Sequence, residues 1–349
     1  MKNIILNITH DILNLISEID EFRGEWRLLG KLRPDRLNIL RKVATIESIG
    51  SSTRIEGAKL SDQEIEKLLQ GVKTTSFASR DEEEVVGYAQ AMELIFESYN
   101  DISLSENHIK QLHAMLLKYS SKDTRHRGEY KKLPNHVEAF DVNGKSAGVI
   151  FETTAPFETP EKMRLLIEWT NLAFSEKQQH PLLTIAIFVV CFLAIHPFQD
   201  GNGRLSRIIT TLLLLQSGYT YIPYSSLEHV VEQNKNNYYL ALRRAQSTLD
   251  TDNSKLNEWI VQFLKYLQIQ KNVLLNKLEK ERIMTNLSSL SQAILELAKE
   301  HGQITITNLE TLTQANRNTL KLQLKNLVAK GYLEKYGQGK NTGYSFRDF

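Results

Sequence analysis

The longest apolar run of the chain constrains its fold most strongly. It spans residues 182–195, with one polar interruption, and ends at a turn that contains Gly201 and Gly203. A membrane span needs about 20 apolar residues, so this shorter run predicts a helix buried in a protein core. A second apolar segment, 202–216, follows the turn and stops before Gly218, a residue type common just past a helix end. The sequence therefore predicts two core helices joined by a tight turn.

Length and composition place the chain among globular proteins with more than one domain. At roughly 100 to 200 residues per domain, 349 residues predict two or three domains. Hydrophobic residues make up 41% and charged residues 24%, which excludes a disordered or collagen-like protein. The net charge of +2 provides no overall basic field for nucleic acid or a membrane surface.

Cysteine content and the N-terminal segment predict the compartment. Cys191 is the only cysteine of the sequence, which excludes an internal disulfide framework and a multi-cysteine metal cage and fits a reducing environment. The N-terminal segment interrupts its apolar groups with polar and charged residues, so it lacks the continuous apolar stretch of a signal peptide. We expect a cytoplasmic protein with no membrane segment.

Helical periodicity covers most of the chain, so the expected fold class is mostly α. Ser61 and Glu64 form a predicted capping box that opens a helix ending at Gly71. Residues 124–160 instead mix turn residues with short β-prone pieces, which predicts a loop and a hairpin. Further helices are expected after Pro34 and at 81–99, 105–119, 160–174, 237–248 and 255–283, the last as a charged spacer between domains.

The pattern changes near residue 287 to a compact unit. Its predicted elements are a helix (292–300), a short strand (304–306), two helices (308–313 and 317–330) and two β-prone arms around a glycine-rich turn. This order resembles a winged helix, which predicts a winged-helix-like α+β domain at the C-terminus. The expected division is an N-terminal helical region (1–100), a core (101–250), a linker helix (251–286) and this domain (287–349).

The strongest chemical signal is HPFQDGNGRLSR, residues 196–207, which connects the two apolar helices. Its glycines force a turn, and the following helix directs free backbone N–H groups into that turn, where phosphate binds favourably. Arg204 and Arg207 are expected to share one helix face, opposite a buried stripe of Leu205, Ile208, Ile209 and Leu212. Two positive charges are therefore predicted beside an anion site.

Two more side chains of this segment add chemistry. Asp200 offers a hard carboxylate oxygen suited to Mg²⁺, which proteins usually bind through one or two carboxylates together with phosphates and water. His196 offers a base that titrates near neutral pH. The combination predicts phosphate chemistry on a nucleotide.

The segment resembles the signature of the Fic family, HPFxDGNGR with a second arginine three residues later, and every defined position is present. The resemblance covers about residues 46–248 and includes RGEY at 127–130 and the pair Tyr238 and Tyr239. It implies a Fic-type helical domain with a small β-hairpin flap. The implied activity is Mg²⁺-dependent transfer of AMP from ATP to a Tyr, Thr or Ser hydroxyl of a target protein, including the enzyme itself.

The resemblance also implies a role for each matching residue. His196 would deprotonate the target hydroxyl for attack on the α-phosphate, and Asp200 would hold Mg²⁺. Arg204 would bind the γ-phosphate and Arg207 the adjacent phosphate oxygens. Other nucleotide contacts are implied at Gly201, Asn202, Gly203, Leu205, Ser206, Tyr238, Tyr239 and Gln246, where packing in a core is an equal alternative for the two tyrosines.

A target-docking flap is implied at Gly148, Val149, Ile150 and Phe151, where the family carries a strand edge that pairs with an extended target segment. The proline run that many members carry just after the flap is missing here. Flap length and target register are therefore open.

A second motif, SSTRIEG, matches the family's inhibitory pattern of Ser or Thr, three residues, Glu, then Gly or Asn. It places Ser52, Glu56 and Gly57 at a helix end, as in the subgroup with an N-terminal inhibitory helix. The resemblance implies that Glu56 pairs with Arg204 and withholds it from the γ-phosphate. Two alternatives are a solvated helix-end glutamate and a hydrolase, in which Glu56 orients a water that removes AMP from a modified protein.

The remaining candidates lie outside these motifs. His113 is more typical of a satisfied core residue than of a metal ligand, because the histidines lack zinc-ligand spacing. Arg317, Lys321 and Lys325 recur every four residues on the third C-terminal helix, the element that enters the major groove in DNA-binding winged helices. A DNA-binding regulator with a nucleotide-sensing site is thus a further alternative, and homodimer formation or partner docking through this unit is another.

Overall fold

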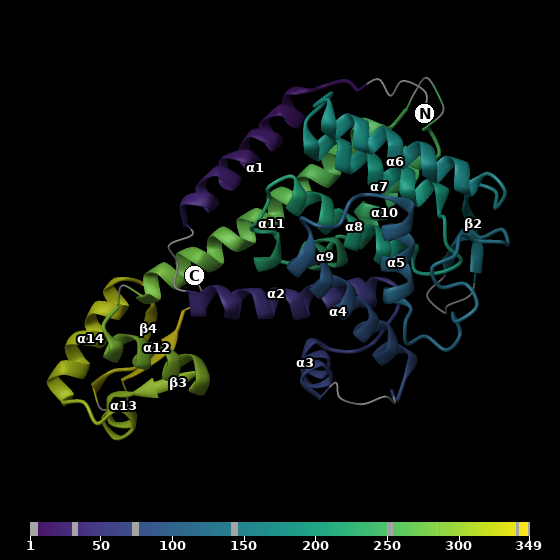
Figure 1. Ribbon diagram of the computed structural model, residues 1–349. Helices are drawn as coiled ribbons and strands as arrows, with labels where there is room; N and C mark the ends of the chain where they lie inside the picture. The colour runs from purple at the N-terminus through teal and green to yellow at the C-terminus, as the bar shows by residue number, and fades with distance from the viewer. Residues whose placement is uncertain are drawn as a thin grey trace. The chain divides into compact units, whose positions relative to one another are not determined.

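The protein forms two compact units, Met1–Leu274 and Leu275–Phe349 (Figure 1). The boundary lies inside the predicted linker helix, and the regions 1–100 and 101–250 belong to one unit. Across the described chain, no helix has both the length and the apolar character needed to cross a membrane. The computed structural model describes residues 6–29, 34–71, 77–140, 146–249, 251, 254–285, 287–339 and 342–347.

Two helices form the centre of the first unit, with the bounds that the sequence predicts: α7 (Pro181–Ile195) and α8 (Asn202–Gln216). α8 is buried on all sides, since only Gly203 and Gln216 escape full burial. The predicted buried stripe is confirmed, and the side that carries Arg204 and Arg207 is buried as well. Besides α7, the helices packed on α8 include α2 (Pro34–Ile55), α4 (Arg80–Ser98) and α5 (Glu106–Leu116).

The other helices of this unit partly match the predicted pattern. The capping box is confirmed, because Ser61 N donates to Glu64 Oε2 at 2.8 Å and Glu64 N donates back to Ser61 Oγ at 3.4 Å. Sequence periodicity missed α1, although its buried residues Ile12, Leu15, Ile19 and Phe22 follow helical spacing. The helices not yet given are α1 (His10–Leu29), α3 (Asp62–Gly71), α6 (Thr159–Ser175), the 3₁₀ turn η1 (Ile222–Tyr224), α9 (Leu227–Gln233) and α10 (Lys235–Gln246).

The long helix α11 (Leu256–Thr285) was expected to be a spacer, and for its first part this is wrong. Trp259 is fully buried, and its indole N–H donates to Ala186 O of α7 at 2.7 Å. A buried indole N–H needs such a partner, so α11 is anchored to the central helix. The first part of α11 is core structure, and the residues of the core that it buries include Leu256, Trp259, Ile260, Phe263, Leu264, Tyr266, Leu267 and Leu274.

The predicted hairpin is present between α5 and α6 and consists of β1 (His136–Phe140) and β2 (Ser146–Glu152). The strands are antiparallel, with His136 opposite Glu152 and Phe140 opposite Ser146. The register shifts twice along the pair, and such irregularities bend and twist a hairpin.

The second unit has the order of elements expected for a winged-helix-like domain. Its sheet is antiparallel with strand order β3-β5-β4, and its helices share one apolar core with that sheet. The elements are α12 (Ser289–His301), β3 (Gln303–Thr305), α13 (Ile306–Thr313), α14 (Arg317–Ala329), β4 (Leu333–Tyr336) and β5 (Gly343–Phe346).

Candidate active site

The turn between α7 and α8 is held by its own backbone and by one amide side chain. His196 ends α7 in the left-handed region, with φ 52°, and Gly201 precedes α8 with φ 78°. Asn202 closes the turn, because its Oδ1 accepts from Phe198 N at 2.9 Å and its Nδ2 donates to Phe198 O at 2.7 Å. A non-glycine residue in this backbone region costs free energy and often marks a functional position.

His196 has the protonation state that a base requires. Its Nδ1 is buried and has no hydrogen-bond partner among the described residues. Burial, followed by the positive charge of Lys131, lowers the pKa of His196 to about 4, although the carboxylates of Glu56 and Asp200 act in the opposite direction. The ring is therefore neutral at pH 7 and able to accept a proton.

A second histidine, His113 of α5, binds the backbone of the turn at Asp200. Its Nδ1 accepts from Gly128 N at 2.8 Å, so its Nε2 carries the hydrogen that Asp200 O accepts at 3.0 Å. The ring also stacks on Phe198, with centroids 3.9 Å apart. The prediction of a satisfied core histidine is confirmed, but no sequence pattern indicated that its partner is the Asp200 backbone.

Arg207 is held by the end of α2. Its Nε donates to Ser52 Oγ at 2.8 Å, and its Nη2 donates to Ser52 O at 3.0 Å and to Glu56 Oε1 at 2.7 Å. The Arg207 side chain is only 8% exposed. Burial would raise the pKa of the Glu56 carboxyl, but Arg207 and then Arg204 hold that pKa below its usual value. The result is a charged, directly hydrogen-bonded pair.

Arg204 does not meet Glu56, so the expected Glu56–Arg204 pair is wrong. Arg204 Nη1 lies 2.8 Å from Glu84 Oε2, and its Nη2 lies 3.5 Å from Asp200 Oδ1. Successive helical residues point about 100° apart. Gly203 lies against Glu56 at the end of α2, and Arg207, one turn later, points to the same side of α8. Arg204 directly follows Gly203 and therefore points to another side, toward Glu84 of α4. The Arg204 side chain is 2% exposed, and its buried Nε has no hydrogen-bond partner among the described residues.

The Glu56 carboxylate lies against the first turn of α8. A Cβ placed on Gly203 would lie only 2.3 Å from Glu56 Oε1, so glycine is required for this contact. Gly57 follows with φ 107°, which lets the chain leave α2 there. The first turn of a helix favours negative charge. Glu56 therefore occupies part of the predicted anion site, and it is paired with Arg207 while its side chain is 31% exposed.

Asp200, the predicted Mg²⁺ ligand, is a carboxylate whose two oxygens contact an N–H group and two guanidinium groups. Its Oδ1 accepts from Gly201 N at 2.6 Å, and its Oδ2 lies 3.1 Å from Arg80 Nη2. Burial would raise the pKa of Asp200, but the charge of Arg204 and the Gly201 N–H hold it below its ordinary value. Within the described ranges, no three His, Cys, Asp or Glu side chains gather around a metal position. A single carboxylate with phosphate and water ligands suits Mg²⁺.

The predicted nucleotide contacts beyond the turn lie on α8 (Leu205 and Ser206) and on α10 (Tyr238, Tyr239 and Gln246). Leu205 and Ser206 are buried, and the Ser206 hydroxyl donates to Gly203 O at 2.7 Å. Tyr239 lies beside Arg207 and Glu56, since both charges act on its hydroxyl. Gln246 is buried at the end of α10, and its contact with the nucleotide stays a prediction.

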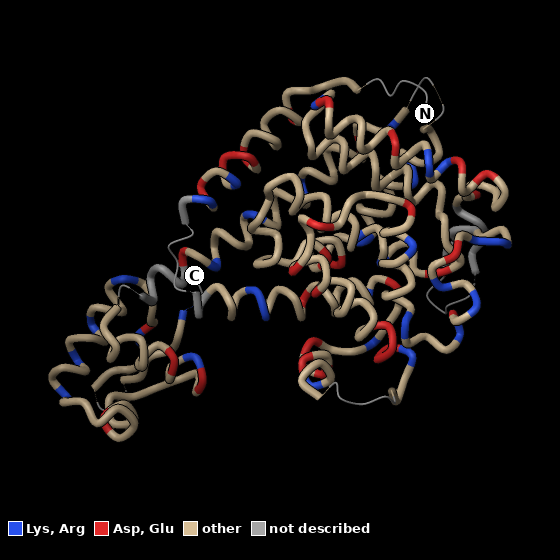
Figure 2. Tube along the Cα trace, viewed as in Figure 1, with Lys and Arg blue, Asp and Glu red and all other residues tan. Residues whose placement is uncertain are grey.

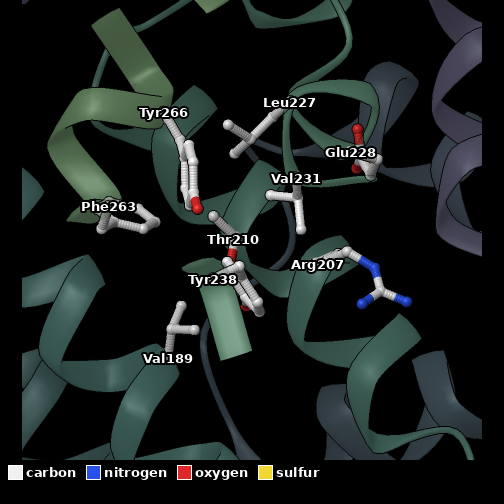
Figure 3. A pocket seen from close by; sticks show the side chains of 9 residues that line it. All are labelled: Val189, Arg207, Thr210, Leu227, Glu228, Val231, Tyr238, Phe263 and Tyr266. Atoms are coloured by element: carbon white, nitrogen blue, oxygen red, sulfur yellow. The ribbon is translucent and has the colours of Figure 1, made fainter. Parts of the chain in front are cut away.

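Tyr238 packs in the core, and its nucleotide contact stays a prediction. Its ring packs against Trp259 and Tyr266, with centroids 5.3 and 6.0 Å apart. Figure 3 shows it in a small cavity, with the guanidinium of Arg207 directed away from the aromatic rings. The cavity volume is about 20 Å³, enough for one water and too small for a nucleotide base.

The flap residues fall on β2 as the resemblance implied. Gly148 pairs with Ala139, Val149 with Glu138, and Phe151 with Val137. Residues 141–145 at the tip lie outside the described residues. After the strand, Thr154 N donates to Ala194 O at 3.4 Å, which connects the flap to the end of α7.

Several residues of the site lie outside the sequence motifs. Arg80 and Glu84, one turn apart on α4, contact the metal-binding candidate Asp200 and Arg204 respectively. Lys131 is buried beside the turn and acts on the pKa of His196. The only available signal was the position of Lys131 directly after RGEY.

Comparison with known proteins supports the resemblance. Residues 103–214 match the model of the Fic/DOC family. A probable protein adenylyltransferase of Aquifex aeolicus is 32% identical over 99 residues, and the protein adenylyltransferase Fic of Drosophila willistoni is 26% identical over 207 residues. The matches cover 28% and 59% of this chain, but only 28% and 38% of those relatives' own lengths.

Solved structures share the fold. A Fic family protein from Desulfovibrio desulfuricans has a TM-score of 0.60 at 22% identity, over 98% of this chain and 97% of that chain. A Fic domain containing signaling protein from Bacteroides thetaiotaomicron has a TM-score of 0.58 at 26% identity, over 73% of this chain and 96% of that chain. The fold is therefore that of Fic proteins, with a mostly helical architecture.

Proposed function

We propose that this chain, which carries a Fic/DOC family domain at residues 103–214, is a protein adenylyltransferase that rests in an autoinhibited state. The substrates would be ATP and a hydroxyl side chain of a target protein. Relatives named protein adenylyltransferases support the direction of the reaction. The turn between α7 and α8 supplies the chemistry.

His196 performs the proton transfer in this proposal. The target oxygen forms a bond to the α-phosphorus of ATP, the bond from that phosphorus to the bridging oxygen breaks, and pyrophosphate leaves. The hydroxyl proton passes to His196, whose neutral ring is available because its pKa is lowered to about 4. In-line geometry and charge neutralisation account for most of the catalysis in such transfers.

The charged groups of the turn would hold the triphosphate. Asp200 would bind Mg²⁺, which neutralises phosphate charge when present. Arg204, with its unpartnered buried Nε, and Arg207 would bind phosphate oxygens in water-excluded surroundings. The first turn of α8 would add its backbone N–H groups.

A single observation carries the autoinhibition: Glu56 binds Arg207 and lies against Gly203 at the same time. A phosphate at the first turn of α8 and the Glu56 carboxylate would compete for one volume and one guanidinium. Triphosphate would therefore bind in a way that leaves the α-phosphate out of line for attack. In this proposal the arginine that Glu56 withholds from ATP is Arg207 and not Arg204.

The test is AMP incorporation from α-labelled ATP into the protein and into proteins of a cell lysate. Glu56→Gly should raise incorporation strongly, because Arg207 and the anion site become free. Glu56→Gln is the matched variant, since it keeps the side-chain volume and loses the charge, and it should raise incorporation less. Equal incorporation by all three proteins would exclude autoinhibition by Glu56.

The alternative hydrolase reaction, in which water removes AMP from a modified protein, is distinguished by the same residue. If Glu56 orients a water, Glu56→Gly would lose the ability to remove AMP from a modified protein while its transfer activity stays unchanged. Labelled, pre-modified protein provides the substrate for this measurement.

A second candidate function, DNA binding, rests on α14. Arg317, Lys321 and Lys325 are all exposed on this helix, and Lys and Arg recur along it in Figure 2. Arg317 also pairs with Glu310 at 2.5 Å, which leaves the two lysines as the more available charges. A gel shift with genomic fragments at low salt tests this function, and absence of any shift would exclude it.

A further inference from the structure

A buried lysine lies at the root of the β1–β2 hairpin and is used by none of the proposed catalytic steps. The Lys131 residue is only 3% exposed. Its Nζ donates to Asn135 Oδ1 at 2.8 Å, Thr153 Oγ1 at 2.8 Å and Ile195 O at 3.0 Å. An ammonium group has three N–H donors, and here each has one acceptor.

Two of the three acceptors stand at the two ends of the hairpin. Asn135 directly precedes β1, and Thr153 directly follows β2. They also bind each other, because Thr153 Oγ1 donates to Asn135 Oδ1 at 2.6 Å and lies 2.8 Å from Asn135 O. The lysine therefore closes the hairpin at its root.

The third acceptor belongs to the catalytic turn. Ile195 O is the carbonyl just before His196, and Lys131 N donates to Pro197 O, just after it, at 2.9 Å. Asn135 Nδ2 adds a hydrogen bond to Phe198 O at 2.8 Å. The same small cluster thus binds backbone on both sides of His196.

We propose that Lys131 is a positioning residue that fixes the root of the flap hairpin to the backbone of the His196 turn, so that the docked target hydroxyl and the base keep one geometry. This inference rests on the proposed AMP transfer for its catalytic consequence. The contacts themselves do not depend on it.

The charge of Lys131 adds an electrostatic consequence. Burial lowers the pKa of Lys131 to about 8, so the amine is still mostly protonated at pH 7. A positive charge at this place disfavours protonation of His196, while Glu56 and Asp200 favour it. Removing the charge of Lys131 should therefore raise the pKa of His196.

The experiment compares full-length variants in the Glu56→Gly background. Lys131→Met removes the three hydrogen bonds and the charge, and Lys131→Arg keeps the charge but cannot direct three donors into the same cage. Thr153→Val removes one acceptor and leaves the lysine. Lys132→Met is the matched control, because Lys132 is the exposed neighbour.

Lys131→Met should lower the rate of AMP transfer about tenfold to a hundredfold with unchanged affinity for ATP, because misplacement of reacting groups costs rate and not nucleotide binding. As the pH is lowered, the rate of Lys131→Met should begin to fall at a higher pH than the rate of the parent. Lys131→Arg should keep the pH profile and still lose rate. Lys132→Met should match the parent in both measurements.

Two further readouts need no catalysis. Hydrogen exchange at the β1 and β2 amides should accelerate in Lys131→Met and Thr153→Val. The NMR titration of His196, assigned by its absence in His196→Gln, should shift upward relative to the Glu56→Gly parent in Lys131→Met alone. If the Glu56→Gly parent transfers no AMP, the proposed function fails, and these two readouts still decide the positioning role.

The proposal is overturned if Lys131→Met equals Lys132→Met in hydrogen exchange and in the His196 titration. If circular dichroism shows that Lys131→Met does not fold, Thr153→Val replaces it in the test. Its hydrogen exchange and its rate of AMP transfer are then measured. Unchanged exchange and rate in Thr153→Val would then overturn it.

Discussion

Two helices of this protein, α8 and α14, carry cations at helical spacing, and their surroundings differ. In α8, Arg204 and Arg207 are 2% and 8% exposed, and each meets a carboxylate from a distant segment. In α14, Lys321 and Lys325 are exposed. Buried charge costs stability unless it is partnered, whereas exposed pairs contribute little. The comparison teaches that cations at helical spacing can have opposite surroundings, which the spacing alone does not predict.

The largest expected effect concerns the buried side of this comparison. Arg207→Ala should lower AMP transfer by about a thousandfold, in the wild type and in Glu56→Gly alike, because loss of an arginine that stabilises phosphate charge has effects of this size. Measured rates from α-labelled ATP check it. Lys321→Ala on α14 is the control and should leave the rate unchanged. A surviving activity in Arg207→Ala would remove the distinction between the two helices.

The base gives an effect of comparable size with a different signature. His196→Ala should lower transfer by about 10² to 10⁴-fold, the usual contribution of a general base, while ATP titrations keep their affinity. The wild-type rate should not decline from pH 8 to pH 5, because the pKa of His196 is lowered to about 4. A decline centred near the ordinary histidine value would contradict the buried-base assignment.

Buried and exposed histidines extend the comparison to stability. Burial lowers the pKa of His113 from 6.5 to about 4, so below pH 6.5 the unfolded chain binds a proton that the folded chain does not. Stability from this group is complete above pH 6.5 and should fall by about 2 kcal/mol at pH 5, in urea unfolding. His113→Gln should remove this part of the dependence, while His196, whose pKa is also lowered to about 4, keeps its own part. The exposed His301→Gln should keep it, and equal slopes for both variants would refute the difference.

A smaller effect is expected when one buried partner is removed. Glu56→Gly leaves Arg207 without its carboxylate, which should cost about 1 to 2 kcal/mol, less than a fully buried pair because the Glu56 side chain is 31% exposed. Thermal melts without nucleotide should show the loss. Addition of Mg²⁺ and ATP should restore the melting temperature by mass action. An unchanged melting temperature without nucleotide would show that the pair contributes nothing to stability.

The smallest effect is expected on the exposed side. Lys321→Glu with Lys325→Glu should change stability by less than about 0.5 kcal/mol, as surface substitutions usually do. Any DNA binding should weaken and lose part of its salt dependence, measured by titration at two salt concentrations. A large loss of stability would mean that α14 resembles α8 more than its exposure indicates.

Local signals allowed the sequence to predict much of the fold. The bounds of α7 and α8 follow from a proline, glycines and an apolar run, and the Ser61–Glu64 cap is a contact between near neighbours. The partners of Arg204 and Arg207 were not predictable, because they depend on which helices pack on which side of α8. His113 was placed in a core, but its acceptor is a backbone carbonyl 87 residues away, and backbone acceptors leave no sequence pattern.

The contact between Glu56 and Gly203 has a consequence for how this chain can change. A side chain at position 203 would collide with the Glu56 carboxylate and would also fill the first turn of α8. Under the proposed function, substitution there would displace the Glu56 carboxylate and also crowd the proposed phosphate site. Substitutions in SSTRIEG remove only the resting contact. Activating substitutions are therefore expected at the end of α2 and not at position 203, where a Cβ would meet Glu56.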